Sequence, residues 1–272
     1  MAKKGALYII NEERRNVMKA NYHTHTPRCN HARGTEEQYI KAAIEAGHRV
    51  IGFSDHSPWH YNSKFVPTMR MKLSELDHYL ETLKALREKY KDKIEVKIGL
   101  ECEYYPQYMD WLKETLKEKE IDYIILGNHF KDSDEHGPYY GTKTADDRIL
   151  KRYVDDAIAA MKTGLYSYVA HPDVIHYYDA QSPIYKLEME RLCVAAKEMN
   201  IPLEFNLLGY STQRHYPNES FWEIAARNNN TAILGIDAHD LFQYKDEKWE
   251  AKATQYLNDL GIELIDEITY LR

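Results

Sequence analysis

Metal-binding side chains recur at the ends of short hydrophobic runs in this chain. Seven runs are visible, and six of them end in histidine, aspartate or glutamate, residue types that bind transition metals. With one histidine from the loop after the first run, the candidate ligands are His23, His25, His31, His56, Glu101, His129, His171, Asp237 and His239. Parallel strands of a barrel bring their carboxyl ends to one mouth, so we expect a multinuclear metal site there.

Two of the runs carry ligand pairs at the spacing of a β-strand. Residues i and i+2 of a strand point to the same face, so His23 and His25 direct two imidazoles into one space. Asp237 and His239 do the same with a carboxylate and an imidazole. One such pair is weak evidence for a metal site, but two pairs with further ligand types at the same strand ends make a strong signal.

Other polar residues near these runs are predicted to have supporting roles. Asp55 has the opposite strand parity to His56, so we expect it to orient a ligand or shuttle a proton rather than bind a metal. Glu103 shares the parity of Glu101 and either holds a ligating histidine or is an exposed carboxylate at the mouth. The histidines interpreted as structural are His48, His78 and His176.

Amphipathic segments alternate with the hydrophobic runs. Segment 35–47 begins with an N-cap candidate, Thr35, has acidic residues in its first turn and ends at Gly47, so it is predicted to be a helix. Further helices are predicted over 74–90, 107–119, 145–164, 184–200, 218–229 and 249–261. Strand followed by helix, seven times, predicts an α/β fold, a distorted (β/α)7 TIM-like barrel with its metal site at the carboxyl ends of the strands.

Composition fits one barrel domain over residues 1–272, because no linker or low-complexity tract divides the chain. The hydrophobic fraction of 43% can bury a sizeable core. A net charge of −7 argues against broad affinity for nucleic acid, which is held mainly by surplus lysine and arginine. Nothing in the sequence indicates the oligomeric state.

The expected location is the cytoplasm, without a membrane partner. The amino-terminal stretch is too interrupted by charge for a signal peptide, and no run of about 18 apolar residues offers a transmembrane span. Cys29, Cys102 and Cys193 lack a CxxC spacing and cannot all pair within the chain, which fits a reducing compartment. Cys29 and Cys102 are interpreted as small apolar filler rather than soft metal ligands.

The motifs NYHTHT, CNHA, SDHSPW, GLECEYY, GNHF, AHPD and GIDAH follow one another along the chain. In order and spacing they resemble the motifs of the PHP superfamily (polymerase and histidinol phosphatase). From about residue 20 to its end the chain resembles the stand-alone histidinol-phosphate phosphatases of that superfamily, on its overall length, on HTHTPRCNHA and on the LEFN…YP segment. The resemblance implies the same distorted barrel, with three metal ions at the carboxyl ends of its strands.

Carried over to this chain, the resemblance implies three sets of ligands. The first ion takes His23, His25, Glu101 and Asp237; the second shares Glu101 and adds His129 and His171; the third takes His31, His56 and His239. Ligands with only nitrogen and oxygen donors favour Zn, Fe or Mn. Three divalent cations carry more positive charge than two carboxylates remove, which suits a dianionic phosphate monoester.

The implied reaction is hydrolysis of L-histidinol phosphate to L-histidinol and phosphate, a step of histidine biosynthesis. Arg214 and His215 lie in the loop after the sixth run, where they could contact phosphate and protonate the leaving oxygen. An exposed polar loop without a catalytic role fits these two residues equally well. Weaker candidates in other upper loops are His60, Lys131 and His136.

Two other functions compete with this one. A different PHP-type phosphoesterase, acting on nucleotides or nucleic-acid ends, would use the same metals, although the acidic chain favours a small-molecule partner. A catalytically silent barrel, whose metals only stabilise the fold, is disfavoured because no ligand of the set is missing.

Overall fold

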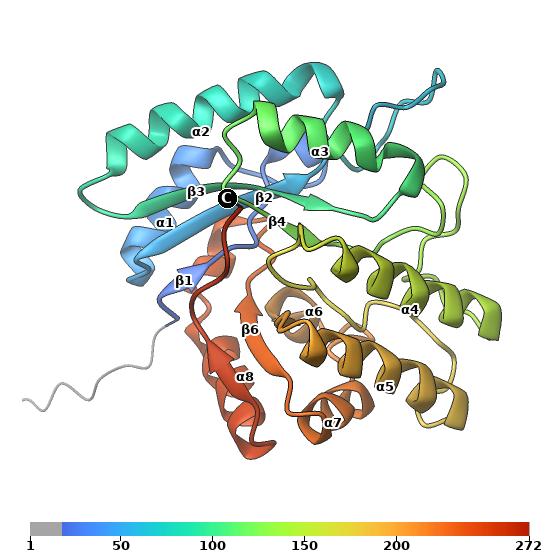
Figure 1. The fold of residues 1–272 in the computed structure, drawn as a ribbon. Coiled ribbons are helices and arrows are strands. Elements are labelled where there is room, and N and C mark those ends of the chain that lie inside the picture. Colours follow the sequence, from blue (N-terminus) through green and yellow to red (C-terminus); the bar gives the residue numbers. More distant parts are fainter. Residues whose placement is uncertain (1–17, 272) are drawn as a thin grey trace, which may run out of the picture.

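The computed structural model describes residues 18–271, which form a curled parallel β-sheet with helices on its outer side (Figure 1). The prediction that the amino-terminal stretch is not a signal peptide concerns mostly segment 1–17, which is outside the described residues. None of the helices in the described part is long and apolar enough to cross a membrane. The parallel sheet and the helices that cover it confirm the predicted α/β fold.

The strands fall into two parallel groups. The first is β1 (Ala20–Asn21), β2 (Val50–His56), β3 (Glu95–Cys102) and β4 (Tyr123–Leu126), paired in that order. The second is β5 (Leu203–Asn206), β6 (Thr231–Gly235) and β7 (Glu263–Ile265). Six of the seven predicted runs therefore contain a strand, and β7 is an additional one that the hydrophobic pattern did not predict.

Isolated bridges join the two groups. Val169 pairs in parallel with Leu126 at the end of β4 and with Leu203 at the start of β5. On the opposite side, Thr24 beyond β1 pairs with Ala238 beyond β6. The run 166–173 was predicted to be a strand but contributes only this bridge residue, because the backbone turns into the left-handed region at His171, with φ 29°. Isolated bridges therefore link the two groups of the curled sheet on both sides.

Helices follow the strands as predicted, with an additional short one. Their bounds are α1 (Glu36–Ala46), α2 (Leu76–Tyr90), α3 (Met109–Glu118), α4 (Asp147–Lys162), α5 (Pro183–Glu198), α6 (Leu207–Ser211), α7 (Glu219–Arg227) and α8 (Glu247–Asp259). Thr35 caps α1 by accepting from the backbone N–H of Gln38, and Gly47 ends it at φ 87°, a left-handed conformation that suits glycine. The short α6 follows β5 directly and was not predicted.

Tyrosines fill part of the interior of the curled sheet. Tyr22, Tyr123 and Tyr168 belong to one buried cluster. They come from different strand positions: Tyr22 follows β1, Tyr123 begins β4, and Tyr168 precedes the Val169 bridge. A Cβ atom at Gly99 would stand 2.4 Å from the Tyr123 ring, so glycine at this position of β3 admits that ring. Because Gly99 and Glu101 share a strand face, the ring lies below Glu101 and supports the floor of the site.

Candidate metal centre

All nine predicted ligands come together where the strands have their carboxyl ends. His56 is the last residue of β2, and Glu101 is the last but one of β3. The others follow β1, β4, the Val169 bridge and β6 along the chain. The parallel direction of the strands therefore collects side chains that are far apart in sequence.

The Glu101 carboxylate lies at the centre of the cluster. Its Oε1 is 2.9 Å from His171 Nε2 and 3.2 Å from His129 Nε2. Its Oε2 faces three further rings, at 2.9 Å from His56 Nδ1, 3.5 Å from His25 Nε2 and 3.6 Å from His23 Nε2. A Cβ atom at Gly127 would stand 2.2 Å from Oε1, so glycine at that position leaves room for the carboxylate. With five imidazoles around one carboxylate, Glu101 is placed to serve more than one ion.

Asp237 forms a second anionic point beside Glu101. Its Oδ1 is 3.3 Å from His25 Nε2 and 3.5 Å from His23 Nε2, so the two carboxylates share these rings. The Asp237 backbone is left-handed, with φ 53°, and the same Oδ1 lies 3.3 Å from His239 Nδ1. The pair of residues at i and i+2 therefore faces the same space as the His23 and His25 pair.

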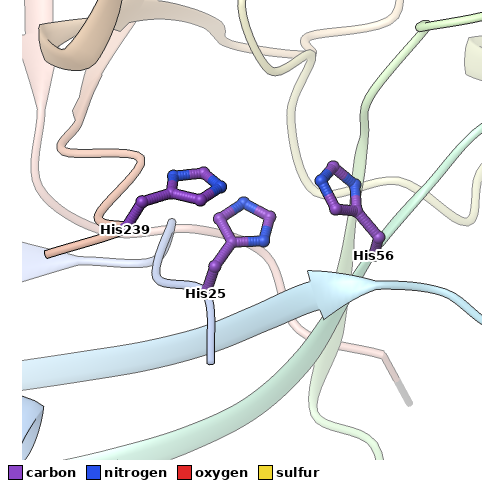
Figure 2. Close-up of side chains that lie close together, drawn as sticks. All are labelled: His25, His56 and His239. Atoms are coloured by element: carbon purple, nitrogen blue, oxygen red, sulfur yellow. The ribbon is translucent and has the colours of Figure 1, made fainter. Parts of the chain in front are cut away.

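The outer part of the cluster is formed mainly by imidazoles, although the Cys29 thiol, predicted to be apolar filler, also lies within 4.8 Å of donor atoms of His31 and His239. His31 Nε2 and His239 Nε2 are 2.9 Å apart. The His25 and His239 rings stack with centroids 4.2 Å apart, and His56 faces them from the tip of β2 (Figure 2). Ligand atoms of His25, His56 and His239 all lie within 4.8 Å of one another, which is close enough to share an ion.

The donor atoms fit metal ions because several of them are buried without a hydrogen-bond partner. The unpartnered atoms facing the centre include His23 Nε2, His25 Nε2, His56 Nδ1, Glu101 Oε2 and Asp237 Oδ1. Burying such atoms without a partner costs free energy, and buried polar groups without partners are rare. Nitrogen and oxygen donors around a divalent cation remove that cost, so the arrangement is typical of a metal site.

Protonation differs between the inner and outer rings. Burial alone would lower the pKa of His25 and His129, but the carboxylates beside them raise these pKa values to about 9 and about 10. For His239, burial and the neighbouring His25 lower the pKa to about 3, and burial likewise lowers that of His31. For Glu101 and Asp237, burial acts to raise the pKa, but the surrounding histidines hold both well below their usual range.

Glu204 and Asn206, at the carboxyl end of β5, hold the inner ligands, a role that the sequence analysis did not predict. Glu204 Oε1 is 2.6 Å from His23 Nδ1, and Oε2 accepts from the backbone N–H of His171 at 2.9 Å. Asn206 Nδ2 donates to Glu204 at 2.9 Å and to Asp237 Oδ2 at 3.1 Å. These contacts fix the orientation of ligands from three separate elements.

Two other carboxylates stand behind the ligands. Glu103 is buried, not exposed, with Oε1 3.1 Å from His129 Nδ1, in agreement with the prediction that it holds a ligating histidine. Asp55 is also buried, and its Oδ1 is 3.5 Å from His25 Nδ1. Its other oxygen accepts from the backbone N–H of Thr26 at 3.2 Å. Asp55 therefore lies on the far side of the His25 ring from the centre.

A cavity of about 420 Å³ opens above the cluster. Apart from ligands, its walls are formed by Met69, Phe130, Tyr139, Val174, Leu208, Arg214 and Tyr216. Arg214 lies in this wall, as expected, and its Nη1 donates to the Tyr216 hydroxyl at 2.8 Å. A cavity of this kind accommodates a small molecule with one anionic end.

His215 has a different environment from Arg214. Its Nε2 is 2.7 Å from the Val174 carbonyl oxygen, so it donates there, and its ring stacks on His176 with centroids 4.0 Å apart. The residues lining the cavity do not include His215, nor His60, Lys131 or His136. The predicted acid role of His215 remains a prediction.

In sequence, the chain is similar to a known domain family and to curated phosphatases. Residues 21–207 match the model of the PHP domain family. A probable histidinol-phosphatase of Deinococcus radiodurans is 28% identical over 227 residues, which is 80% of this chain and 85% of that protein. The histidinol-phosphatase of Bacillus subtilis is 27% identical over 124 residues, 43% of this chain and 46% of that protein.

Among solved structures, the fold resembles histidinol phosphate phosphatase from Lactococcus lactis, which was crystallised with zinc, L-histidinol and phosphate. The TM-score is 0.72 at 20% identity, with 92% of this chain and 98% of that chain covered. At this identity the likeness supports the fold.

Proposed function

The chain belongs to the PHP domain family, and on that premise we propose that it is a metal-dependent phosphomonoesterase that hydrolyses L-histidinol phosphate to L-histidinol and phosphate. The observation that carries this proposal is the set of imidazoles around the Glu101 carboxylate, beneath a cavity whose wall holds Arg214. The relatives named histidinol-phosphatase support the choice of substrate and a role in histidine biosynthesis.

The proposed cofactors are three divalent ions, Zn, Fe or Mn. The first set of ligands is His23, His25, Glu101 and Asp237, the second is Glu101, His129 and His171, and the third is His31, His56 and His239. The distances from Glu101 to the first two sets, and the close approach of His31 to His239, support this partition. Divalent ions supply a nucleophile at neutral pH and neutralise charge on a phosphoryl group.

The side chains of this protein then bind and orient the substrate. Arg214 can present its guanidinium fork to phosphoryl oxygens, and its bond to Tyr216 holds the fork at the cavity wall. Asp55 keeps the His25 ring turned toward the centre by facing its Nδ1 atom. His215 is the proposed general acid for the leaving oxygen, and to act it must turn from the Val174 carbonyl toward the cavity.

The proposal also includes the domain organisation, the type of partner and the cellular location of the protein. The chain is one barrel domain of seven strand–helix units, in which the segment around Val169 is the fifth strand and β7 is an addition outside the count. The partner is a small phosphate monoester rather than nucleic acid, in keeping with the net charge of −7. A biosynthetic enzyme of this kind is placed in the cytoplasm.

A substrate panel tests the proposal. Protein reconstituted separately with Mn, Zn and Fe is assayed with L-histidinol phosphate, nucleoside monophosphates, bis-p-nitrophenyl phosphate and single-stranded DNA. We expect L-histidinol phosphate to have the highest kcat/KM, and the E101Q variant purified in parallel to remove that activity. Preference for a nucleotide or for DNA would identify another phosphoesterase of the family, and no activity with any metal would indicate a silent barrel.

A further inference from the structure

We propose that Arg70 is a positioning residue of the metal centre, which orients His129 through Glu103 and ties together the loops around the cavity. Neither the family motifs nor the ligand pattern includes this arginine. The inference rests on the proposed function, because it assigns Arg70 to the support of ions that this function requires.

Arg70 is completely buried although it lies in the long loop 57–72. Its Nη1 and Nη2 donate to the two carboxylate oxygens of Glu103 at 3.0 and 2.7 Å, a bidentate pair. Nη1 also donates to the Ser57 carbonyl at 3.0 Å, and Nε donates to Asp134 Oδ2 at 2.8 Å. Lysine could not reproduce this fork of four bonds, so the site uses properties specific to arginine.

Glu103 links Arg70 to the proposed metal ligand His129 through hydrogen bonds. It receives the two Arg70 bonds, one from Trp59 Nε1 at 3.0 Å and one from His129 Nδ1 at 3.1 Å. With Nδ1 donating to Glu103, Nε2 is the His129 atom left to bind a metal once it has lost its proton, and it lies 3.2 Å from Glu101. Carboxylate partners of this kind fix the tautomer and the ring orientation of a ligating histidine.

Arg70 also connects three loops that shape the site. Its carbonyl oxygen accepts from Asn30 Nδ2 at 3.1 Å, in the loop that carries His31. Its Nε bond reaches Asp134, in the loop after β4, and Asp134 also accepts from the Tyr61 hydroxyl at 2.6 Å. The loops joined in this way supply the cavity residues His31, Met69 and Phe130. One side chain thus couples a ligand orientation to the shape of the cavity.

A purely structural ion pair is the alternative, and the two roles predict different effects of an apolar replacement. Replacing a buried ion pair by apolar residues of similar volume is often neutral or stabilising. An R70M/E103L double variant removes the pair and the Nδ1 partner of His129, and it leaves Asp134 without its Arg70 bond, so some loss of stability is expected. R70K keeps Glu103 beside His129 but cannot form the bidentate pair, so it isolates the role of Arg70: if Arg70 only stabilises the fold, R70K should retain its metals as the wild type does.

The decisive measurement is metal affinity in the double variant, followed by chelator competition and thermal unfolding. We expect a folded protein with a lower unfolding temperature than the wild type and an affinity for one ion about 10–100-fold weaker, the usual effect of removing such a partner. The matched control is R152M/D156L, which removes an ion pair on α4 away from the centre and should leave metal affinity unchanged. R70K is measured in parallel, with the same weakening expected.

Wild-type metal affinity in R70K would overturn the inference. That result leaves the proposed function intact, because the function is tested by wild-type metal content and turnover alone. A wild-type protein without bound metal or activity would instead contradict the proposed function itself.

A second variant separates the two arms of Arg70. D134A removes the loop contact but not the Glu103 pair, so we expect a several-fold higher KM for L-histidinol phosphate with metal affinity unchanged. Weaker metal binding in D134A, with KM unaltered, would show that the loops do not act separately and would overturn this part of the inference.

Discussion

The inner half of the candidate metal centre, formed by the two proposed ligand sets that share Glu101, and its rim, formed by His31, His56 and His239, hold several of their histidines by different means. In the inner half, the second ring nitrogens of His23 and His129 face the carboxylates of Glu204 and Glu103, at 2.6 and 3.1 Å. At the rim, His31 Nδ1 is 2.7 Å from the carbonyl oxygen of Cys29, and His239 Nδ1 is 2.9 Å from that of Asp237. Anionic side chains therefore orient His23 and His129, whereas a backbone carbonyl group orients His31 and both the carbonyl and the carboxylate of Asp237 face His239 Nδ1.

This difference predicts unequal affinities for metal ions. A carboxylate partner raises the basicity of a ligating histidine and fixes its ring, whereas a carbonyl partner does so without charge. Glu101, which both inner sets share, lies on β3, while His31 is an exposed residue of a loop. We therefore expect the inner ions to be held tightly and the rim ion to exchange, and the following variants test that contrast.

The largest effect is expected from Glu101, which both inner ligand sets share. The E101Q variant removes the charge at the centre, and we expect kcat/KM to fall by about 1,000-fold or more, equivalent to about 4 kcal/mol. Steady-state kinetics with metal analysis checks this. The control is E114Q, an exposed carboxylate on α3, which should behave as the wild type does. Turnover near that of the wild type in fully loaded E101Q would contradict a bridging role.

Glu204 should have the next largest effect. The E204Q variant keeps the shape but removes the charged acceptor of His23 Nδ1, so we expect inner-ion affinity to fall by about 10–100-fold. Competition with a chelating dye measures this affinity. The exposed carboxylate of Glu223 on α7 provides the control, E223Q. Loss of the rim ion before an inner ion in E204Q would reverse the proposed contrast.

Arg214 lies in the wall of the cavity, so its replacement should weaken substrate binding rather than metal binding. In R214A, the loss of a charged hydrogen bond to phosphate should raise KM by about tenfold, since such bonds contribute about 1.5–3 kcal/mol. Metal content should stay at the wild-type value. R148A, an exposed arginine on α4, is the control. A lower metal content in R214A would show that the rim loop supports the ions directly.

How much of this site was predictable depends on the range of the contacts. The pairs His23–His25 and Asp237–His239 followed from strand parity, and the helix at 35–47 followed from its cap residues, because both signals are local. Glu204 lies 181 positions from the ring it holds, so its role could not be read from spacing.

Arg70 and β7 illustrate the same limit. Arg70 lies between two methionines in a loop, where the sequence shows neither its burial nor its partners Glu103 and Asp134. The strand β7 has three residues, too few for a periodic signal. Local patterns therefore predicted which residues gather in the cluster, and the tertiary contacts behind them required the structure.

Proton release on metal binding provides a further test of the contrast. Nearby carboxylates overcome the effect of burial and raise the pKa of His25 to about 9 and of His129 to about 10, so both rings are protonated at pH 7.5 without metal. Their nitrogens bind metal only after losing these protons. Inner-ion affinity should therefore fall as the pH falls below about 9, by about tenfold per unit for each proton released.

The rim should release no proton, because burial and His25 lower the pKa of His239 to about 3. Titration calorimetry in buffers of different ionisation enthalpy counts the protons for each ion. The H239N variant should lose the rim ion without altering the proton count of the inner ions. Equal proton release from both halves would contradict the difference in their electrostatics.

The smallest effect is expected from His215, which does not line the cavity. Its Nε2 donates to the Val174 carbonyl and its ring stacks on His176, so it can protonate a leaving oxygen only after turning. We therefore expect H215N to retain its metals and to lose less kcat than the roughly 100-fold that a well-placed general acid supplies. The loss should be larger for L-histidinol phosphate than for p-nitrophenyl phosphate, whose leaving group barely needs a proton. H78N, on α2, is the matched control. Equal losses with both substrates would argue against an acid role, and unchanged kinetics would direct the search to His60, Lys131 and His136.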